Sequence, residues 1–167
     1  MNNIYLIGMM ASGKSVVGEK LAKILDMEHI DIDNDIEAIN ETKISDIFNE
    51  SGEQKFREME SAYFIEKSKQ KNNIFSTGGG IILNKHNRSI LKNDGTTFFL
   101  EADCQILLDR IHDISERPLL NRDNSINSIL SIWEQREKYY YESSDYTINS
   151  NRLSVNDVVN QIIIKMQ

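Results

Sequence analysis

The chain has 167 residues, a length typical of one globular domain. Its 26 acidic and 19 basic side chains give a net charge of −7, which argues against sequence-independent nucleic-acid binding and against a basic helix on a membrane surface. A single cysteine, Cys104, excludes an internal disulfide, and the apolar run at residues 4–11 is too short for a membrane span and lacks the basic start of a signal peptide. We therefore expect a monomeric cytoplasmic protein that binds neither nucleic acid nor membranes.

Short apolar runs alternate with longer helical patterns along the chain. Runs of apolar residues predict strands, and apolar residues three or four positions apart predict helices. The predicted strands cover residues 3–7, 28–33, 74–77, 96–100 and 146–148, and the predicted helices cover residues 14–25, 36–70 with a break near Gly52, 84–91, 102–111, 125–143 and 154–166. This alternation predicts an α/β fold with a mostly parallel sheet covered by helices on both faces. Such sheets bind ligands beyond the carboxyl ends of their strands.

Residues 8–15 read GMMASGKS and match the phosphate-binding pattern G-x-x-x-x-G-K-[ST]. A predicted strand precedes the motif and an amphipathic helix follows it, which is the context that phosphate binding requires. In such a loop the backbone N–H groups surround the phosphate oxygens, Lys14 contacts the outer phosphates and Ser15 binds Mg²⁺. An ordinary glycine-containing turn is the alternative. The motif predicts a nucleoside triphosphate site but not the reaction.

Two observations narrow the class of nucleotide-dependent protein. The segment NKHN at residues 84–87 lacks the Asp that would recognise guanine and lies too early in the chain, which disfavours a guanine-specific switch protein. The chain is also close to the minimum length for a sheet with a lid, so it has no room for a domain that binds a protein substrate. A kinase of a small molecule is the favoured class.

Asp31 and Asp33 lie at the end of the second predicted strand, where alternation places both carboxylates on one side of the sheet edge. One carboxylate could hold Mg²⁺ through water while the other orients a substrate hydroxyl for in-line attack. Because Asp35 and Glu37 follow, the alternative is an acidic and solvated start of a helix.

Three consecutive glycines, Gly78 to Gly80, follow the third predicted strand. Such a run favours close approach of the backbone to a ligand, with a flexible turn as the alternative. Arg57 lies on a predicted helix one turn before Glu60. An arginine suits bidentate recognition of a carboxylate, although a surface ion pair would explain an isolated arginine equally well.

Taken together, these motifs closely resemble those of the shikimate kinase family, and the resemblance extends over essentially the whole chain. The matching segments are GMMASGKS (8–15), HIDID (29–33) with IE (36–37), GE (52–53), FR (56–57) with Glu60, STGGG (76–80), RPLL (117–120), and Arg136 with Tyr140. The resemblance implies transfer of the γ-phosphoryl group of ATP to the 3-hydroxyl of shikimate, in aromatic amino-acid biosynthesis. It also implies Mg²⁺ and a three-layer P-loop fold of the nucleoside-monophosphate-kinase type with a mobile lid. The expected domain covers residues 1–167, with a substrate-binding region at about 33–60 and the lid at about 112–124.

The resemblance assigns roles to individual residues. Asp33 would bind the ring hydroxyls and orient or deprotonate the attacking one, while Asp31 and Ser15 would hold Mg²⁺. The implied catalytic residues are Lys14, Asp33 and Arg117. The implied nucleotide contacts are Ala11, Ser12, Gly13, Lys14, Ser15, Val16, Arg110, Arg117 and Arg152. The implied substrate contacts are Asp33, Arg57, Gly78, Gly79, Gly80 and Arg136, of which the two arginines would clamp the carboxylate.

The sequence departs from the family pattern at several positions. Ala11 stands where the phosphate loop usually has glycine, His29 stands where an aromatic residue is common, and no proline occurs near Val155 to contact adenine. Two alternatives stay open: a related small-metabolite kinase, such as a gluconate or nucleotide kinase, and an ATP-binding regulatory or scaffolding protein. The pair Arg57 and Arg136 favours an acidic substrate.

Overall fold

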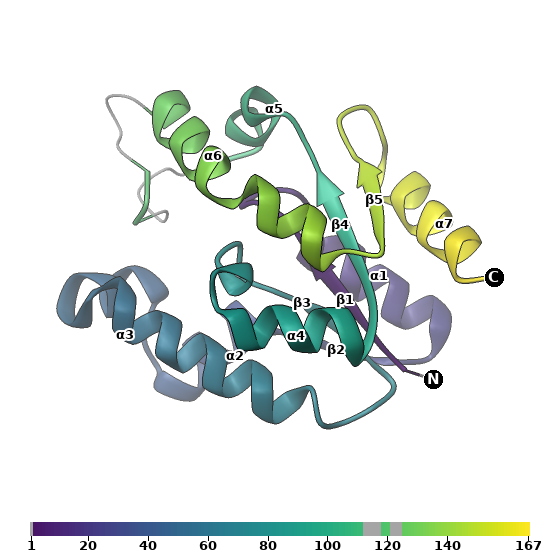
Figure 1. The fold of residues 1–167 in the computed structure, drawn as a ribbon, viewed down its shortest axis with the longest axis horizontal. Coiled ribbons are helices and arrows are strands. Elements are labelled where there is room, and N and C mark those ends of the chain that lie inside the picture. The colour runs from purple at the N-terminus through teal and green to yellow at the C-terminus, as the bar shows by residue number, and fades with distance from the viewer. Residues whose placement is uncertain (1, 112–117, 121–124) are drawn as a thin grey trace.

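The computed structural model describes residues 2–111, 118–120 and 125–167 and contains a five-stranded sheet between two layers of helices (Figure 1). The strands are β1 (Asn3–Ile7), β2 (Glu28–Asp31), β3 (Asn73–Ser76), β4 (Gly95–Glu101) and β5 (Tyr146–Asn149). The helices are α1 (Lys14–Leu25), α2 (Ile32–Asn40), α3 (Ile44–Lys67), η1 (Ile81–Leu83), α4 (Lys85–Asn93), α5 (Cys104–Asp109), α6 (Ser125–Ser143) and α7 (Val155–Met166). All four strand pairings are parallel, in the order β2-β3-β1-β4-β5. The predicted fold class is confirmed.

The two faces of the sheet bury separate hydrophobic clusters, because successive side chains of a strand point to opposite faces. On β1, Tyr5 and Ile7 belong to the cluster that includes residues of α3, α4 and α6, whereas Ile4 and Leu6 belong to the cluster under α1 and α7. Each of these β1 side chains is at most 2% exposed. The central strand is therefore buried on both sides, as a parallel sheet between helices requires.

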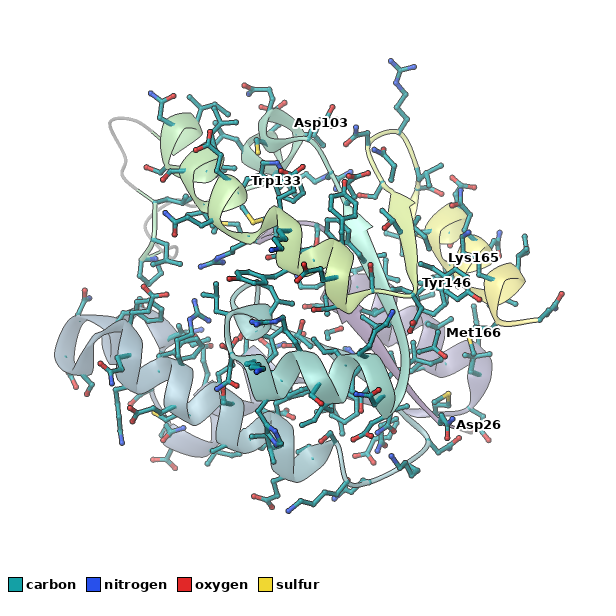
Figure 2. The ribbon with its side chains drawn as sticks, in the orientation of Figure 1. Asp26, Asp103, Trp133, Tyr146, Lys165 and Met166 are labelled. Atoms are coloured by element: carbon teal, nitrogen blue, oxygen red, sulfur yellow. The ribbon has the colours of Figure 1, made fainter. Side chains whose placement is uncertain are left out.

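The edge strand β5 is covered on one side by the C-terminal helix. Figure 2 shows Tyr146 on β5 and Lys165 on α7, and the Lys165 ammonium nitrogen lies 5.2 Å from the centroid of the Tyr146 ring. The Tyr146 ring also stacks on Phe98 of β4 with a centroid distance of 5.3 Å. These contacts fix the carboxyl end of the chain against the sheet.

The second predicted strand is wrong in its last two residues. It ends at Asp31, because Asp31 is the N-cap of α2 and its carboxylate accepts a hydrogen bond from the Asn34 N–H at 3.2 Å. Asp33 therefore lies in the first turn of a helix, as the alternative prediction of an acidic helix start required, but its carboxyl oxygen Oδ1 is buried and not solvated. The long helical pattern that follows is divided into α2 and α3, and Gly52 interrupts α3 with φ 81° and ψ 165°.

Two expectations concern segments beyond the sheet. The predicted lid at 112–124 and its Arg117 lie largely outside the described residues, which include only 118–120 of that segment. Within the described ranges, every helix is too short or too polar to cross a lipid bilayer.

Candidate active site

The loop between β1 and α1 wraps around the ammonium group of Lys14. This group donates hydrogen bonds to the carbonyl oxygens of Gly8 at 2.9 Å and Met9 at 2.7 Å, and to the Ser12 hydroxyl at 3.2 Å. Gly13, the N-cap of α1, has φ 92° and no side-chain cap, and the first turn carries no acidic residue. The N–H groups and the positive end of this helix therefore face the loop with no acidic residue in the first turn of α1, which is an arrangement that binds phosphate.

Ala11 adopts a backbone conformation that favours glycine. Its φ is 59°, in the left-handed region, where a β-carbon is unfavourable. The departure from the family pattern at this position thus has a local consequence, because Ala11 takes the conformation that glycine would adopt more easily.

Asp33 is held in a site that disfavours its charged form. Burial raises the pKa of the Asp33 carboxyl to about 7, and repulsion from Glu60 adds to the rise. The nearby charges of Lys14 and Arg57 lower the pKa but do not cancel this effect. Asp33 Oδ1 and Asp31 Oδ2 are buried and have no hydrogen-bond partner among the described residues. Two acceptor atoms are therefore available to a ligand at the start of α2.

The three glycines after β3 each leave room for a different neighbour. A methyl group on Gly78 would lie 2.1 Å from Glu60 Oε1 and 2.7 Å from Asp33 Oδ1, and one on Gly80 would lie 2.2 Å from the central guanidinium carbon of Arg57. At Gly79 the neighbours are the phosphate loop, at 3.4 Å, and Arg136, at 3.6 Å. The glycines therefore allow close packing of functional side chains, whereas the predicted close approach of this backbone to a ligand stays a prediction.

Arg57 is ion-paired and also lines the cavity, and its binding of a carboxylate stays a prediction. Its guanidinium contacts Glu60 at 2.8 Å and Glu53 at 3.2 Å, and its side chain is 20% exposed. The rings of Phe48 and Phe56 lie 5.9 and 5.1 Å from its central carbon. These contacts hold the planar group in one orientation, as bidentate binding of a carboxylate requires.

One cavity of about 540 Å³ joins these elements. The predicted site residues that line it are Ala11, Gly13, Lys14, Ser15, Val16, Asp31, Asp33, Arg57, Gly78, Gly79, Gly80, Arg110 and Arg136. Ser12 is buried against Lys14, and Arg152 is exposed outside this cavity; its role stays a prediction. Arg110 is fixed at the rim, where its guanidinium donates to the Ser150 carbonyl oxygen at 2.8 Å.

Several residues that support the site are absent from the predicted set. Glu60 is 1% exposed, although its spacing of three residues from Arg57 was a usable signal. His29 Nε2 lies 2.9 Å from the Ser76 hydroxyl, which donates to the Lys14 carbonyl oxygen at 2.9 Å. No pattern in the sequence could reveal this series of hydrogen bonds, because it depends on the pairing of β2 with β3.

In the described part of the chain, no group of three or more His, Cys, Asp or Glu side chains is arranged to hold a metal ion. Two aromatic residues of α6, Trp133 and Tyr140, pack against the sheet. Trp133, labelled in Figure 2, stacks with Tyr140 at a centroid distance of 6.1 Å and with Phe99 at 6.2 Å.

Comparison with known proteins gives a consistent result. The family model for shikimate kinase matches residues 10–167. A shikimate kinase from Sulfurihydrogenibium sp. is 37% identical over 167 residues, covering 100% of this chain and 99% of the relative.

Solved structures agree with the sequence relatives. The structure of shikimate kinase from Acinetobacter baumannii in complex with shikimate superimposes with a TM-score of 0.96 at 33% identity, covering 99% of this chain and 93% of the other. A deoxyadenosine kinase from M. mycoides, with a TM-score of 0.62 at 17% identity over 98% of both chains, shares the fold alone. The chain therefore belongs to the shikimate kinase family and is a small-molecule kinase that uses ATP as co-substrate.

Proposed function

We propose that this chain transfers the γ-phosphoryl group of ATP to the 3-hydroxyl of shikimate, in the pathway to chorismate and the aromatic amino acids. The observation that carries the proposal is that the phosphate loop, Asp33, Arg57 and Arg136 line one cavity. A loop for polyphosphate, a carboxylate for a hydroxyl group and two arginines for an acidic group match the triphosphate of ATP and the hydroxyl and carboxylate groups of shikimate.

Arg57 and Arg136 bind the carboxylate of shikimate. Arg136 is 5% exposed and Arg57 is oriented by its two glutamates, so neither guanidinium needs to be ordered when the substrate binds. The backbone of Gly79 lies beside Arg136 and completes this end of the site. A substrate without an acidic group forms no ion pair with these two guanidinium groups, which selects against neutral polyols.

Asp33 accepts the proton of the attacking hydroxyl. A bond forms between the substrate oxygen and the γ-phosphorus, the bond from that phosphorus to the bridging oxygen breaks, and the hydroxyl proton moves to the Asp33 carboxylate. A pKa of about 7 suits this role, because the carboxylate is ionised in much of the population and still binds a proton well. Lys14 and, by family resemblance, Arg117 neutralise charge on the transferred group.

Mg²⁺ fits the residues beside the phosphate loop. Ser15 lines the cavity at the start of α1, and Asp31 offers a buried oxygen that has no partner among the described residues. Oxygen ligands of this kind, completed by water and phosphate, are those that Mg²⁺ prefers. When bound there, the ion would neutralise phosphate charge.

The remaining assignments complete the proposal. The nucleotide contacts Ala11, Ser12, Gly13, Val16, Arg110 and Arg152 in addition to the residues named above. The chain acts in the cytoplasm as a monomer with one kinase domain over residues 1–167, a substrate-binding region at about 33–60 and a lid at about 112–124. It needs neither nucleic acid nor a membrane.

A coupled assay for ADP release with ATP, Mg²⁺ and shikimate tests this function. We expect Arg57→Lys to raise the KM for shikimate by about tenfold with little change in the KM for ATP, because lysine keeps the charge beside Glu60 but loses bidentate geometry. Arg88→Lys is the matched control, since Arg88 packs on the Tyr139 ring, 4.3 Å away, and does not line the cavity. Turnover that does not depend on shikimate would refute the proposal.

A further inference from the structure

Tyr140 connects two parts of the cavity that are far apart in the sequence. Its hydroxyl donates a hydrogen bond of 2.5 Å to the carbonyl oxygen of Gly79, 61 positions earlier in the chain. The neighbouring glycine carbonyls are bonded locally, since Gly78 accepts from the Ile81 N–H and Gly80 accepts from the Leu83 N–H. The hydrogen bond from Tyr140 thus connects helix α6 to the central residue of the glycine run.

The same phenol lies near Arg136. Arg136 and Tyr140 are four positions apart on α6 and share one helix face. The Arg136 guanidinium also borders Gly79, since a methyl group there would lie 3.6 Å from it, and its charge lowers the pKa of Tyr140 less than burial raises it. Because a phenol has one proton, which goes to Gly79, its oxygen can interact with the guanidinium only as an acceptor. Burial raises the pKa of Tyr140 to about 12, so the hydroxyl remains a donor at neutral pH.

The ring of Tyr140 is rigidly packed. It is 0% exposed and stacks on Phe99 of β4 with a centroid distance of 5.0 Å and an interplanar angle of 6°. Trp133 also stacks on the Tyr140 ring, with a centroid distance of 6.1 Å. A hydroxyl on such a ring has a fixed position, and the groups bonded to it are fixed in turn.

We propose that Tyr140 is a positioning residue that holds Arg136 and the Gly79 backbone in the geometry that binds the substrate carboxylate. This inference rests on the proposed function of the cavity. It adds a role for a residue that contacts neither reacting group. Since the Gly79 position also borders the phosphate loop, the bond keeps the acid-binding end of the cavity at a constant distance from the phosphate end.

Tyr140→Phe tests the inference, because it removes the hydroxyl and keeps the stacked ring. We expect the KM for shikimate to rise about tenfold, equivalent to about 1.4 kcal/mol, while the KM for ATP changes less than about twofold. The matched control is Tyr141→Phe, which removes a hydroxyl bonded to Glu101 from the next position of the same helix. The control should leave both KM values unchanged.

A neutral substrate gives a second readout. The wild type should bind the methyl ester of shikimate more weakly than shikimate. The Tyr140→Phe substitution should weaken binding of the ester much less than binding of the acid, because the neutral ester forms no ion pair with Arg57 and Arg136. Equal losses for acid and ester, equal rises in both KM values, or no difference from Tyr141→Phe would overturn the inference while leaving the proposed function intact. A wild type that does not phosphorylate shikimate would overturn both.

Discussion

Replacing Gly78 by alanine tests how tightly the acidic side of the cavity is packed. The added methyl group would lie 2.1 Å from Glu60 Oε1 and 2.7 Å from Asp33 Oδ1, whereas ordinary contact begins at 3.4 Å. The Glu60 oxygen must therefore retreat by about 1.3 Å, or the glycine backbone must move by as much. Glu60 is 1% exposed and paired with Arg57, so it has little free space.

This displacement reaches both a residue that binds the substrate and the proposed base. Movement of Glu60 shifts Arg57, and direct contact shifts the Asp33 carboxylate. Misplacement of reacting groups by about 1 Å costs on the order of 10²-fold in rate, so we expect kcat/KM for shikimate to fall by about 10²-fold. Binding of ATP, measured by titration calorimetry without shikimate, should change less than about twofold, because the methyl group does not approach the phosphate loop.

Gly79→Ala is the control for simple crowding of the cavity. A methyl group there meets its nearest atoms at 3.4 Å, the limit of ordinary contact, although Gly79 lines the same cavity. A loss in Gly78→Ala that greatly exceeds the loss in Gly79→Ala supports displacement of the carboxylates. Full activity of Gly78→Ala, with a folded protein by thermal unfolding, would refute the reasoning.

Three residues, Asp33, Ala11 and Ser76, give the remaining predictions. The kcat/KM of the wild type should fall as the pH drops below about 7, because protonation removes the Asp33 base, and Asp33→Asn should lower kcat by at least about 10²-fold. The raised pKa means that the folded state binds the Asp33 proton more tightly than the unfolded state, so Asp33→Asn should raise the melting temperature at pH 8 and raise it less at pH 5; the same gain at both would contradict the assignment. Ala11→Gly should stabilise the protein by up to about 1 kcal/mol in urea unfolding, because relief of the left-handed conformation at φ 59° exceeds the added chain entropy; a loss of stability would be the opposite result. Ser76→Ala removes the hydroxyl between His29 and the Lys14 carbonyl oxygen and should cost about 1–2 kcal/mol of unfolding free energy, whereas unchanged stability would show that the bonds contribute little.

Local patterns in the sequence predict a large part of this fold. The bounds of β1, α1 and α6 agree with prediction, because strand, phosphate loop and helix periodicity are all local signals. The end of β2 was wrong, since the alternation in HIDID is typical of a strand, whereas the N-cap bond of Asp31 starts a helix at Ile32. A capping interaction between residues three positions apart therefore outweighed the alternating pattern.

The sequence predicted which residues belong to the site better than it predicted their contacts. The run of glycines predicts close approach, but the partners Glu60 and Arg57 follow only from the position of α3 against η1 and β3. In the same way, the bond from Tyr140 to Gly79 joins a helix and a loop that no short pattern relates. Arg117 lies outside the described residues, so its role rests on the proposal alone.

The place of β3 in the sheet has a consequence for how the family can change its substrate. Because β3 lies between β1 and β2, the phosphate loop and the acids of α2 are separated by two strand spacings, about 10 Å. The loop that closes this interval, Gly78 to Gly80, contributes backbone and no side chains. The separation between the phosphate loop and the acceptor-binding acids is thus set by sheet geometry, while the acceptor is chosen by helices α2, α3 and α6. Evolution or design can therefore alter the acceptor pocket through these helices and leave the phosphate-handling machinery unchanged.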